Sequence, residues 1–325
     1  MLWLSKGNRT REAGSRELVN RPKVRGSLGI VVPFFSNEEY LKCLLNSLVA
    51  QSSTEWVAVV VDDSGSQNRA REIVESFDSN RMSFTKNETN LGIGRCWNIG
   101  LQHLVSNTDV SVFAVIHADD ELEQNYVERV LTAHKVHPDA AAIHTSVSLI
   151  GEKGRSKFSF PDLVKRVTRP GGSKSVVVTS GDNGLASVLK GNFIFCPTLS
   201  FKRDHVTLPL FNDEWKMVID LELVSRLLLS GEVIVGLSER IYRYRRHRNN
   251  LTASYNKTTI RFREEIELYR ELEAKCVSCG FDVSSRIAKR MTIIRLHILY
   301  QLLGSALHLD LSLFRRLIKV FVETF

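Results

Sequence analysis

The sequence predicts an α/β fold, with a mostly parallel sheet flanked by helices and a helical extension at its C-terminal end. Short apolar runs alternate with segments of helical spacing between residues 28 and 131. Strands that alternate with helices imply right-handed crossovers, and therefore parallel strands. The runs are almost continuously apolar, which indicates a sheet covered on both faces. From residue 258 onward only helical spacing remains.

The first expected strand covers residues 28–32 and is stopped by Pro33, which lacks a backbone donor. Apolar residues at intervals of three and four then predict the first helix. The same alternation continues through the first half of the chain. Expected strands are 57–61, 82–85 and 110–116, and the expected helices are marked by Leu41, Leu44, Leu45 and Leu48, by Ala70, Ile73, Val74 and Phe77, by Trp97, Leu101, Leu104 and Val105, and by Tyr126, Val127, Val130 and Leu131.

The second half of the chain is less regular. An apolar stretch covers residues 140–150, and residues 151–184 turn polar and Gly-Pro-rich, which predicts a long loop or insertion. Ordered structure is expected again at 191–195, followed by a helix over 220–229 and strands over 233–237 and 240–244. Apolar stripes then mark the helices of the extension: Phe262, Ile266, Tyr269, Leu272 and Cys276 in one, and Met291, Ile294, Ile298 and Leu302 in the other.

These patterns divide the chain into three parts. Residues 1–26 are basic and polar and predict a mobile lead-in. Residues 27–255 predict the main domain, with one half over 27–122 and the other over 123–255. Residues 256–325 predict a helical region.

Composition narrows the class of protein. The chain has 325 residues, 43% of them hydrophobic, and a net charge of +8. This content supports a sizeable core, and the modest basicity does not by itself indicate a nucleic-acid partner, so none is expected. The five cysteines are odd in number and, apart from Cys276 and Cys279, widely spaced. They do not form a disulfide framework, which favours a reducing compartment. The sequence shows neither the apolar core of a signal peptide nor an apolar run of membrane-spanning length, so we expect a cytoplasmic protein.

Two pairs of adjacent carboxylates follow buried apolar runs. Asp62-Asp63 ends one run, and Asp119-Asp120 follows another within two residues. Adjacent carboxylates repel one another, and a divalent cation with oxygen ligands would relieve that repulsion. In open α/β sheets, ligands bind outside the carboxyl ends of the strands. The two acidic strand ends therefore predict a site for a metal ion and a nucleotide.

Four motifs in order resemble family 2 glycosyltransferases, which use a nucleotide-sugar donor and the Rossmann-like GT-A fold. A later segment strengthens the resemblance, because it is similar to the acidic helix and the Tyr-Arg-x-His tail of that family. The resemblance covers roughly residues 28–255, and it implies a nucleotide-binding half over 27–122 and an acceptor half over 123–255. The motifs are Val31-Val32-Pro33-Phe34-Phe35-Ser36-Asn37, Val61-Asp62-Asp63-Ser64, Asn90-Leu91-Gly92-Ile93-Gly94 and His117-Ala118-Asp119-Asp120, and the later segment holds Trp215, Asp220-Leu221-Glu222-Leu223, Arg226 and Tyr242-Arg243-Tyr244-Arg245-Arg246-His247.

The resemblance implies roles for particular residues. Asp119 and Asp120 would hold Mn²⁺ or Mg²⁺ against the donor diphosphate, and His247 would contact the metal or the phosphate. Asp220 would be the general base that takes the proton of the acceptor hydroxyl in an inverting transfer. Glu222 is the second candidate acid, although residues two apart on a helix point to different faces. The nucleotide contacts implied are Pro33, Phe34, Phe35, Asp63, Asn90, Arg95, Asn98 and Asp119.

Some positions depart from the pattern of the family. His117 stands where the family usually has an aspartate, and it is a metal ligand, a ribose contact or a packed histidine. The family often has an arginine just before the position of Asn98, where this chain has Trp97, and Arg95 stands nearby instead.

The resemblance also implies partners. The acceptor would be a glycan or a lipid-linked glycan at the inner face of a membrane, in the synthesis of a cell-surface polysaccharide. Residues 256–325 carry basic amphipathic faces that would contact the membrane surface or a second copy of the chain, or pack on the catalytic domain.

Two other functions remain open on the sequence alone. One is a catalytically silent nucleotide-sugar-binding module of the same fold. The other is a nicotinamide- or flavin-dependent enzyme, although the glycine fingerprint of such enzymes is missing.

Overall fold

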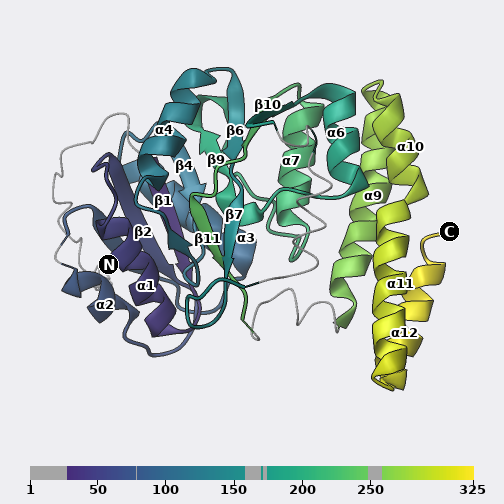
Figure 1. Cartoon of the computed structure of the whole chain (residues 1–325), viewed down its shortest axis with the longest axis horizontal. Coiled ribbons are helices and arrows are strands. Elements are labelled where there is room, and N and C mark those ends of the chain that lie inside the picture. Colours follow the sequence, from purple (N-terminus) through teal and green to yellow (C-terminus); the bar gives the residue numbers. More distant parts are fainter. Residues whose placement is uncertain (1–27, 78, 158–169, 171–173, 248–257) are drawn as a thin grey trace, which may run out of the picture.

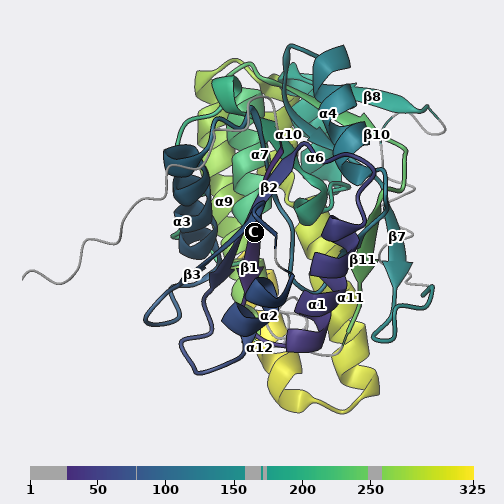
Figure 2. The same cartoon turned by 90° about the vertical axis from the view of Figure 1, so that its left-hand side faces the viewer.

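The computed structural model describes residues 28–77, 79–157, 170, 174–247 and 258–325. The predicted basic lead-in over residues 1–26 lies outside the described residues. The described part has a large sheet flanked by helices, a smaller sheet beside it, and a group of helices at the C-terminal end (Figures 1 and 2). The predicted α/β fold with a C-terminal helical extension is therefore confirmed.

The large sheet has eight strands in the order β3-β2-β1-β4-β9-β6-β10-β8 within the described residues. Strands β3, β2, β1 and β4 are parallel to their neighbours in this half of the sheet, as the sequence predicts. The strand bounds are β1 Leu28–Phe34, β2 Trp56–Asp62, β3 Met82–Lys86, β4 Val112–Val115, β6 Ala140–His144, β8 Val176–Thr179, β9 Ser200–Lys202 and β10 Val233–Leu237.

Helices cover both faces of this sheet, and their bounds agree with the spacing of apolar residues in the sequence. One buried cluster lies between the sheet and α1, α2 and α4, and a second lies between the sheet and α3, α6 and α7. The bounds are α1 Glu38–Val49, α2 Ala70–Ser76, α3 Ile93–Asn107, α4 Tyr126–Val136, α6 Gly181–Lys190 and α7 Ile219–Leu229. Two short 3₁₀ helices, η1 Cys196–Thr198 and η2 Arg203–His205, flank β9.

Strand β1 does not stop at Pro33 but runs one residue further, to Phe34. Pro33 is paired with Val61 of β2, whereas the pairing of β1 with β4 ends at Val31. At Pro33 the strand therefore has a neighbour on one side only. A missing N–H group is tolerated at such an edge position.

The second half of the sheet is less regular than the first. Strand β9 is antiparallel to β4 and β6, and β8 is antiparallel to β10, whereas β6 and β10 are parallel, so the mostly parallel sheet also contains antiparallel pairs. The long loop predicted over 151–184 also ends earlier than expected, because β8 and the start of α6 fall inside it. Strand β8 was missed because its four residues, three of them valines, are enclosed by polar and Gly-Pro-rich residues.

A three-stranded sheet holds the carboxyl end of the main domain beside β4. It consists of β5 Glu121–Leu122, β7 Val147–Ile150 and β11 Tyr242–Arg245. Strand β11 is antiparallel to β5, with Tyr242 opposite Leu122 and Arg243 opposite Glu121. Because β5 directly follows the Asp119-Asp120 pair, this pairing places the residues after β11 next to the acidic motif.

The C-terminal helices stand at the end of the molecule away from α1 and α2 (Figure 1). Their inner residues, such as Phe262, Ile266, Ile298 and Leu317, belong to the same buried cluster as residues of α3 and α7. The bounds are α9 Ile260–Ser278, α10 Asp282–Arg290, α11 Thr292–Leu307 and α12 Leu311–Val322. Among the described residues, none of the helices has the length and apolar character needed to cross a membrane.

Helix α3 approaches the sheet closely at Gly100. A Cβ atom at this position would lie 2.3 Å from Cγ1 of Val31 and 3.1 Å from Cγ2 of Val61. Both valines are fully buried in the sheet, so neither has room to move aside. The glycine therefore sets the distance between α3 and the centre of the sheet.

We predict that Gly100→Ala lowers the free energy of unfolding by about 1–3 kcal/mol, the usual cost of overpacking a core. The matched control is Gly304→Ala in α11, where a Cβ atom meets no heavy atom within 4 Å. Alanine there should raise stability by up to about 1 kcal/mol, because it favours the helix. Urea denaturation measures both changes, and equal effects of the two substitutions would contradict the packing argument.

Candidate active site

The acidic motif lies at the carboxyl end of β4, where the sequence places it. Its two carboxylates have different surroundings. The side chain of Asp119 is 28% exposed, whereas Asp120 is fully buried. The two residues therefore have different roles, although they are adjacent in the sequence.

Asp120 binds strand β11. Its Oδ2 accepts a hydrogen bond from the Tyr242 hydroxyl at 2.7 Å, and its Oδ1 accepts one from the backbone N–H of Arg245 at 2.7 Å. Burial, and then the negative charge of Asp119, raise the pKa of Asp120 well above its ordinary value, and the two hydrogen bonds only partly oppose this. Asp120 thus joins the acidic motif to β11.

Asp119 faces the end of β11 from the other side. Its Oδ2 lies 2.7 Å from Nε2 of His247. Burial raises the pKa of Asp119, but the hydrogen bond with His247 and the nearby imidazoles outweigh burial and hold the pKa below its ordinary value. Asp119 is therefore the carboxylate of the pair that keeps a negative charge, and it is partly accessible.

His117 lies between the acidic motif and α7. Its Nε2 is buried and has no hydrogen-bond partner within the described residues. One ligand atom each from His117, Asp119 and Asp120 lie within 4.8 Å of one another. Burial lowers the pKa of His117, while the charges of Asp119 and Asp220 oppose that shift. The imidazole is thus close to both the acidic motif and Asp220, and it supplies an unused nitrogen.

Asp220 lies in the first turn of α7, where Asn192 donates a hydrogen bond to its Oδ2 at 3.3 Å. The residue at the N-cap of α7, Val218, forms no side-chain cap. Glu264 of α9 takes that place and accepts hydrogen bonds from the backbone N–H groups of Lys216 at 3.1 Å and Met217 at 2.7 Å. A carboxylate at this end also suits the helix dipole. The C-terminal helices therefore fix the helix that carries Asp220.

Glu222 lies on a different face of α7 and is bound elsewhere. Its carboxylate accepts two hydrogen bonds from the Arg226 guanidinium, at 2.8 and 3.3 Å. Arg226 also donates to the backbone carbonyl of Leu210 at 2.7 Å. These contacts assign Glu222 a structural part in holding the loop before α7.

Asp63 holds the loop before α3. Its carboxylate accepts hydrogen bonds from the backbone N–H groups of Leu91 at 2.9 Å and Gly92 at 3.1 Å, and from the Asn87 side chain at 2.8 Å. The Asn90 amide donates to the Asp63 backbone carbonyl at 2.9 Å. The predicted nucleotide residues Asp63 and Asn90 are thus brought together, and they fix the glycine-containing loop.

The other predicted nucleotide contacts lie in different surroundings. Phe35 is 58% exposed just after β1, and Pro33 is partly exposed. Phe34 is buried in the core against α1, which corrects the expectation that all three residues line a base pocket. The Asn98 side chain is held by the backbone of Phe211, donating at 2.7 Å and accepting at 3.0 Å. Arg95 is mostly exposed, and its Nε lies 3.8 Å from an Asp213 oxygen.

Arg245 contacts several parts of the site, although the sequence analysis did not distinguish it from the other basic residues of its segment. Its side chain is 2% exposed and donates to the backbone carbonyls of Asp119 at 2.6 Å and Gly151 at 3.0 Å. It also pairs with Glu121, and its guanidinium lies 4.6 Å from the centre of the Tyr40 ring. The Tyr40 ring in turn lies 5.4 Å from His247. No local spacing predicts this cluster, because its members come from four separate segments of the chain.

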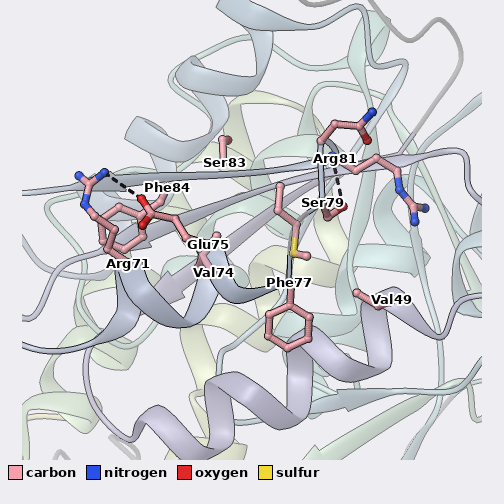
Figure 3. A pocket seen from close by; sticks show the side chains of 11 residues that line it. Val49, Arg71, Val74, Glu75, Phe77, Ser79, Arg81, Ser83 and Phe84 are labelled. Carbon is pink, nitrogen blue, oxygen red and sulfur yellow. Dashed lines mark hydrogen bonds and ion pairs between the residues drawn. The ribbon is translucent and has the colours of Figure 1, made fainter.

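A surface cavity of about 930 Å³ lies elsewhere, at the outer edge of the sheet (Figure 3). It is lined by residues of α2 and β3 and by residues that flank them, among them Arg71, Phe77, Arg81 and Phe84. None of the predicted site residues lines it. Arginines stack on its walls, with the guanidinium of Arg71 4.7 Å from the centre of the Phe84 ring. Charged side chains along a short edge strand protect that strand from pairing with other chains, and this explains the arginines beside β3. We therefore assign the cavity no part in the site.

The Asp120 contact can be tested with two tyrosines that pack against each other, Tyr242 and Tyr126, whose ring centres lie 6.1 Å apart. We predict that Tyr242→Phe lowers the free energy of unfolding by about 1–3 kcal/mol, because a buried carboxylate loses a donor. In the control Tyr126→Phe, the hydroxyl removed has no hydrogen-bond partner within the described residues, so stability should stay the same or rise. Chemical denaturation gives both values, and an equal loss in both variants would argue against the contact.

Comparison with known proteins agrees with this arrangement. Residues 29–175 match the family model described as Glycosyl transferase family 2. Poly(ribitol-phosphate) beta-N-acetylglucosaminyltransferase TarS of Staphylococcus aureus (strain MW2) is 26% identical over 236 residues. That match covers 70% of this chain but only 37% of TarS, so the chain spans little more than a third of that relative.

Solved structures show the same fold. S. aureus TarS 1-349 in complex with UDP-GlcNAc superposes with a TM-score of 0.64 at 17% identity, covering 92% of this chain and 81% of that one. Mannosyltransferase PcManGT from Pyrobaculum calidifontis, in complex with GDP-Man and Mn²⁺, gives 0.57 at 14% identity, covering 95% and 90%. The motif order, the GT-A architecture and the family match agree, and over residues 29–175 the chain is a family 2 glycosyltransferase.

Proposed function

We propose that this chain transfers a sugar from a UDP- or dTDP-sugar to a hydroxyl group of a cell-surface glycan, with inversion at the sugar carbon and with the help of a divalent cation. The observation that carries the proposal is the meeting of Asp119, His247, His117 and Asp220 at the carboxyl end of β4. The proposal that the donor is a UDP-sugar is supported by the TarS complex with UDP-GlcNAc. The proposal of a wall or surface polymer as acceptor is supported by the name of that relative.

The donor set fits a transition-metal ion. Asp119 offers a charged oxygen, His247 lies beside it, and His117 has a buried nitrogen without a partner in the described residues. Mg²⁺ strongly favours oxygen ligands, whereas imidazole nitrogen suits transition metals better. We therefore propose Mn²⁺ rather than Mg²⁺, held by Asp119 and His247. When bound, the ion would neutralise the charge that develops on the departing diphosphate.

Asp120 is assigned a positioning role in this proposal rather than the ligand role that the sequence suggested. Both of its oxygens already accept hydrogen bonds, and the side chain is fully buried. It holds β11, and β11 holds His247. Asp63 is likewise proposed to act through the loop that it fixes, since three of the roughly four acceptor positions of a carboxylate are in use.

Asp220 is proposed as the general base. It is partly exposed at the start of α7, and Asn192 and the capped helix end hold it in place. In the transfer, its carboxylate takes the proton of the acceptor hydroxyl while that oxygen forms a bond to the sugar carbon. The bond to the diphosphate breaks on the opposite face, and the nucleoside diphosphate leaves. Phe35 is proposed to stack on the base, because its ring is exposed next to the loop of Asp63.

The role of Asp220 as general base can be tested by comparison with Glu222, which lies on the same helix. We predict that Asp220→Asn lowers the rate of sugar transfer by about 10²–10⁴-fold, the usual contribution of a general base, while UDP binding stays within twofold. Glu222→Gln should keep the transfer rate and lose only stability, because Glu222 is bound to Arg226. A transfer assay with a panel of nucleotide sugars, together with UDP titration, measures both. Wild-type turnover by Asp220→Asn would remove Asp220 from the mechanism, and binding of a nucleotide sugar without any transfer would favour the silent module.

The metal proposal has a readout that does not need turnover. Thermal shift with UDP should show a larger stabilisation in the presence of Mn²⁺ than with UDP alone or Mn²⁺ alone. In Asp119→Asn and His247→Ala, the Mn²⁺ concentration needed for this effect should rise by at least about 10-fold. The exposed Asp139→Asn serves as the control and should match the wild type. A shift that is indifferent to Mn²⁺ in the wild type would count against a metal-dependent enzyme.

A further inference from the structure

Helix α11 leaves one apolar face uncovered. Its inner residues, such as Ile294 and Ile298, are buried in the shared core, so the helix is docked on the domain. Its outer residues follow one another at intervals of three and four, which places them on a single stripe. They are Leu296 (56% exposed), Leu299 (42%), Tyr300 (57%), Leu303 (68%) and Leu307 (83%).

Helix α12 packs beside α11 and carries an exposed stripe of its own, which includes positive charge. Leu317 and Val320 are buried against the core, whereas Leu311, Ile318 and Val322 are 67%, 44% and 66% exposed. The exposed residues Arg315 and Lys319 lie on the same side, at helical spacing from these aliphatic residues. We call the exposed residues of the two helices together, from Leu296 to Val322, the α11–α12 face.

The turn between the helices is the most apolar part of this face. Leu307 and Leu309 are each 83% exposed and Leu311 is 67% exposed, within five residues. The turn lies at the lower edge of the molecule in both views of the fold (Figures 1 and 2). Three leucines this exposed at a projecting turn form the kind of contiguous apolar patch that marks an interaction site.

The charges of the face decide which partner fits it. Residues 291–322 contain a single carboxylate, Asp310, and that side chain caps α12 by accepting from the backbone N–H of Leu313 at 2.9 Å. Among the described residues, no carboxylate pairs with Arg315 or Lys319. Two copies meeting through this face would bring their cations together without counter-charges, which disfavours a homodimer. An anionic surface would satisfy the cations and cover the leucines at once.

We propose that the α11–α12 face lies on an anionic lipid surface, with Leu307, Leu309 and Leu311 in the acyl boundary and Arg315 and Lys319 against lipid phosphates. Helices with one apolar face and basic residues beside it bind in this way without crossing the bilayer. The proposal is independent of the transfer reaction, since it uses none of the site residues.

Flotation of the full chain with vesicles tests the proposal. The chain should float with vesicles that contain phosphatidylglycerol and should remain behind with pure phosphatidylcholine vesicles. The triple variant L307S/L309S/L311S should bind at least about tenfold more weakly, because the apolar contribution is lost. The variant R315Q/K319Q should lose binding by about tenfold or more, as should the wild type in 0.5 M salt.

Matched controls distinguish binding through the α11–α12 face from nonspecific hydrophobic or electrostatic binding by other surfaces. The variant V136S/V178S/V277S changes three valines of similar exposure on other elements, and K275Q/K289Q removes two positive charges from α9 and α10. Both should float like the wild type. Absence of binding to anionic vesicles, or equal loss in the controls, would overturn the proposal. Light scattering that shows a dimer in the wild type and a monomer in L307S/L309S/L311S would overturn it in favour of a second copy.

Discussion

The site depends on one buried carboxylate. Asp120 has no contact with solvent, and its two oxygens are satisfied by the Tyr242 hydroxyl and the backbone N–H of Arg245. A buried carboxylate is costly unless such donors are present, so the acidic motif and β11 stabilise each other's position. Strand β11 then brings His247 to Asp119 and Arg245 to the backbone of the motif. Asp120, one of the two carboxylates of the acidic motif, therefore holds β11 in place beside that motif.

The sequence predicts the first half of the fold well, because each element there has a clear apolar period and the strands are joined by helices, which makes them parallel. It fails where pairing is set by distant contacts. Strand β9 has three residues, too few for a period, and it inserts antiparallel between β4 and β6. Strand β8 has only four residues and stands within a polar, Gly-Pro-rich stretch, so its short apolar run was not separated from the surrounding loop.

The residues of the candidate site also fall into those that the sequence predicts and those that it does not. Strand ends and helix starts locate Asp63, Asp119 and Asp220, because the motifs are contiguous in the sequence. Residues that hold these groups in place are not foreseen, since they come from remote segments. Asn192 reaches Asp220 across 28 residues, and Glu264 reaches the backbone before α7 across 47. The contact of Glu264 also shows that α9 helps to build the site, although the family resemblance ends before it.

The hydrogen bonds between Asp63 and the loop before α3 affect the free energy of ligand binding. The backbone of Leu91 and Gly92 is held by a carboxylate that comes from the end of β2. Much of the conformational entropy of that loop is therefore lost during folding, before any nucleotide arrives. A ligand that docks against the loop has less ordering to impose, so more of its contact energy appears as affinity.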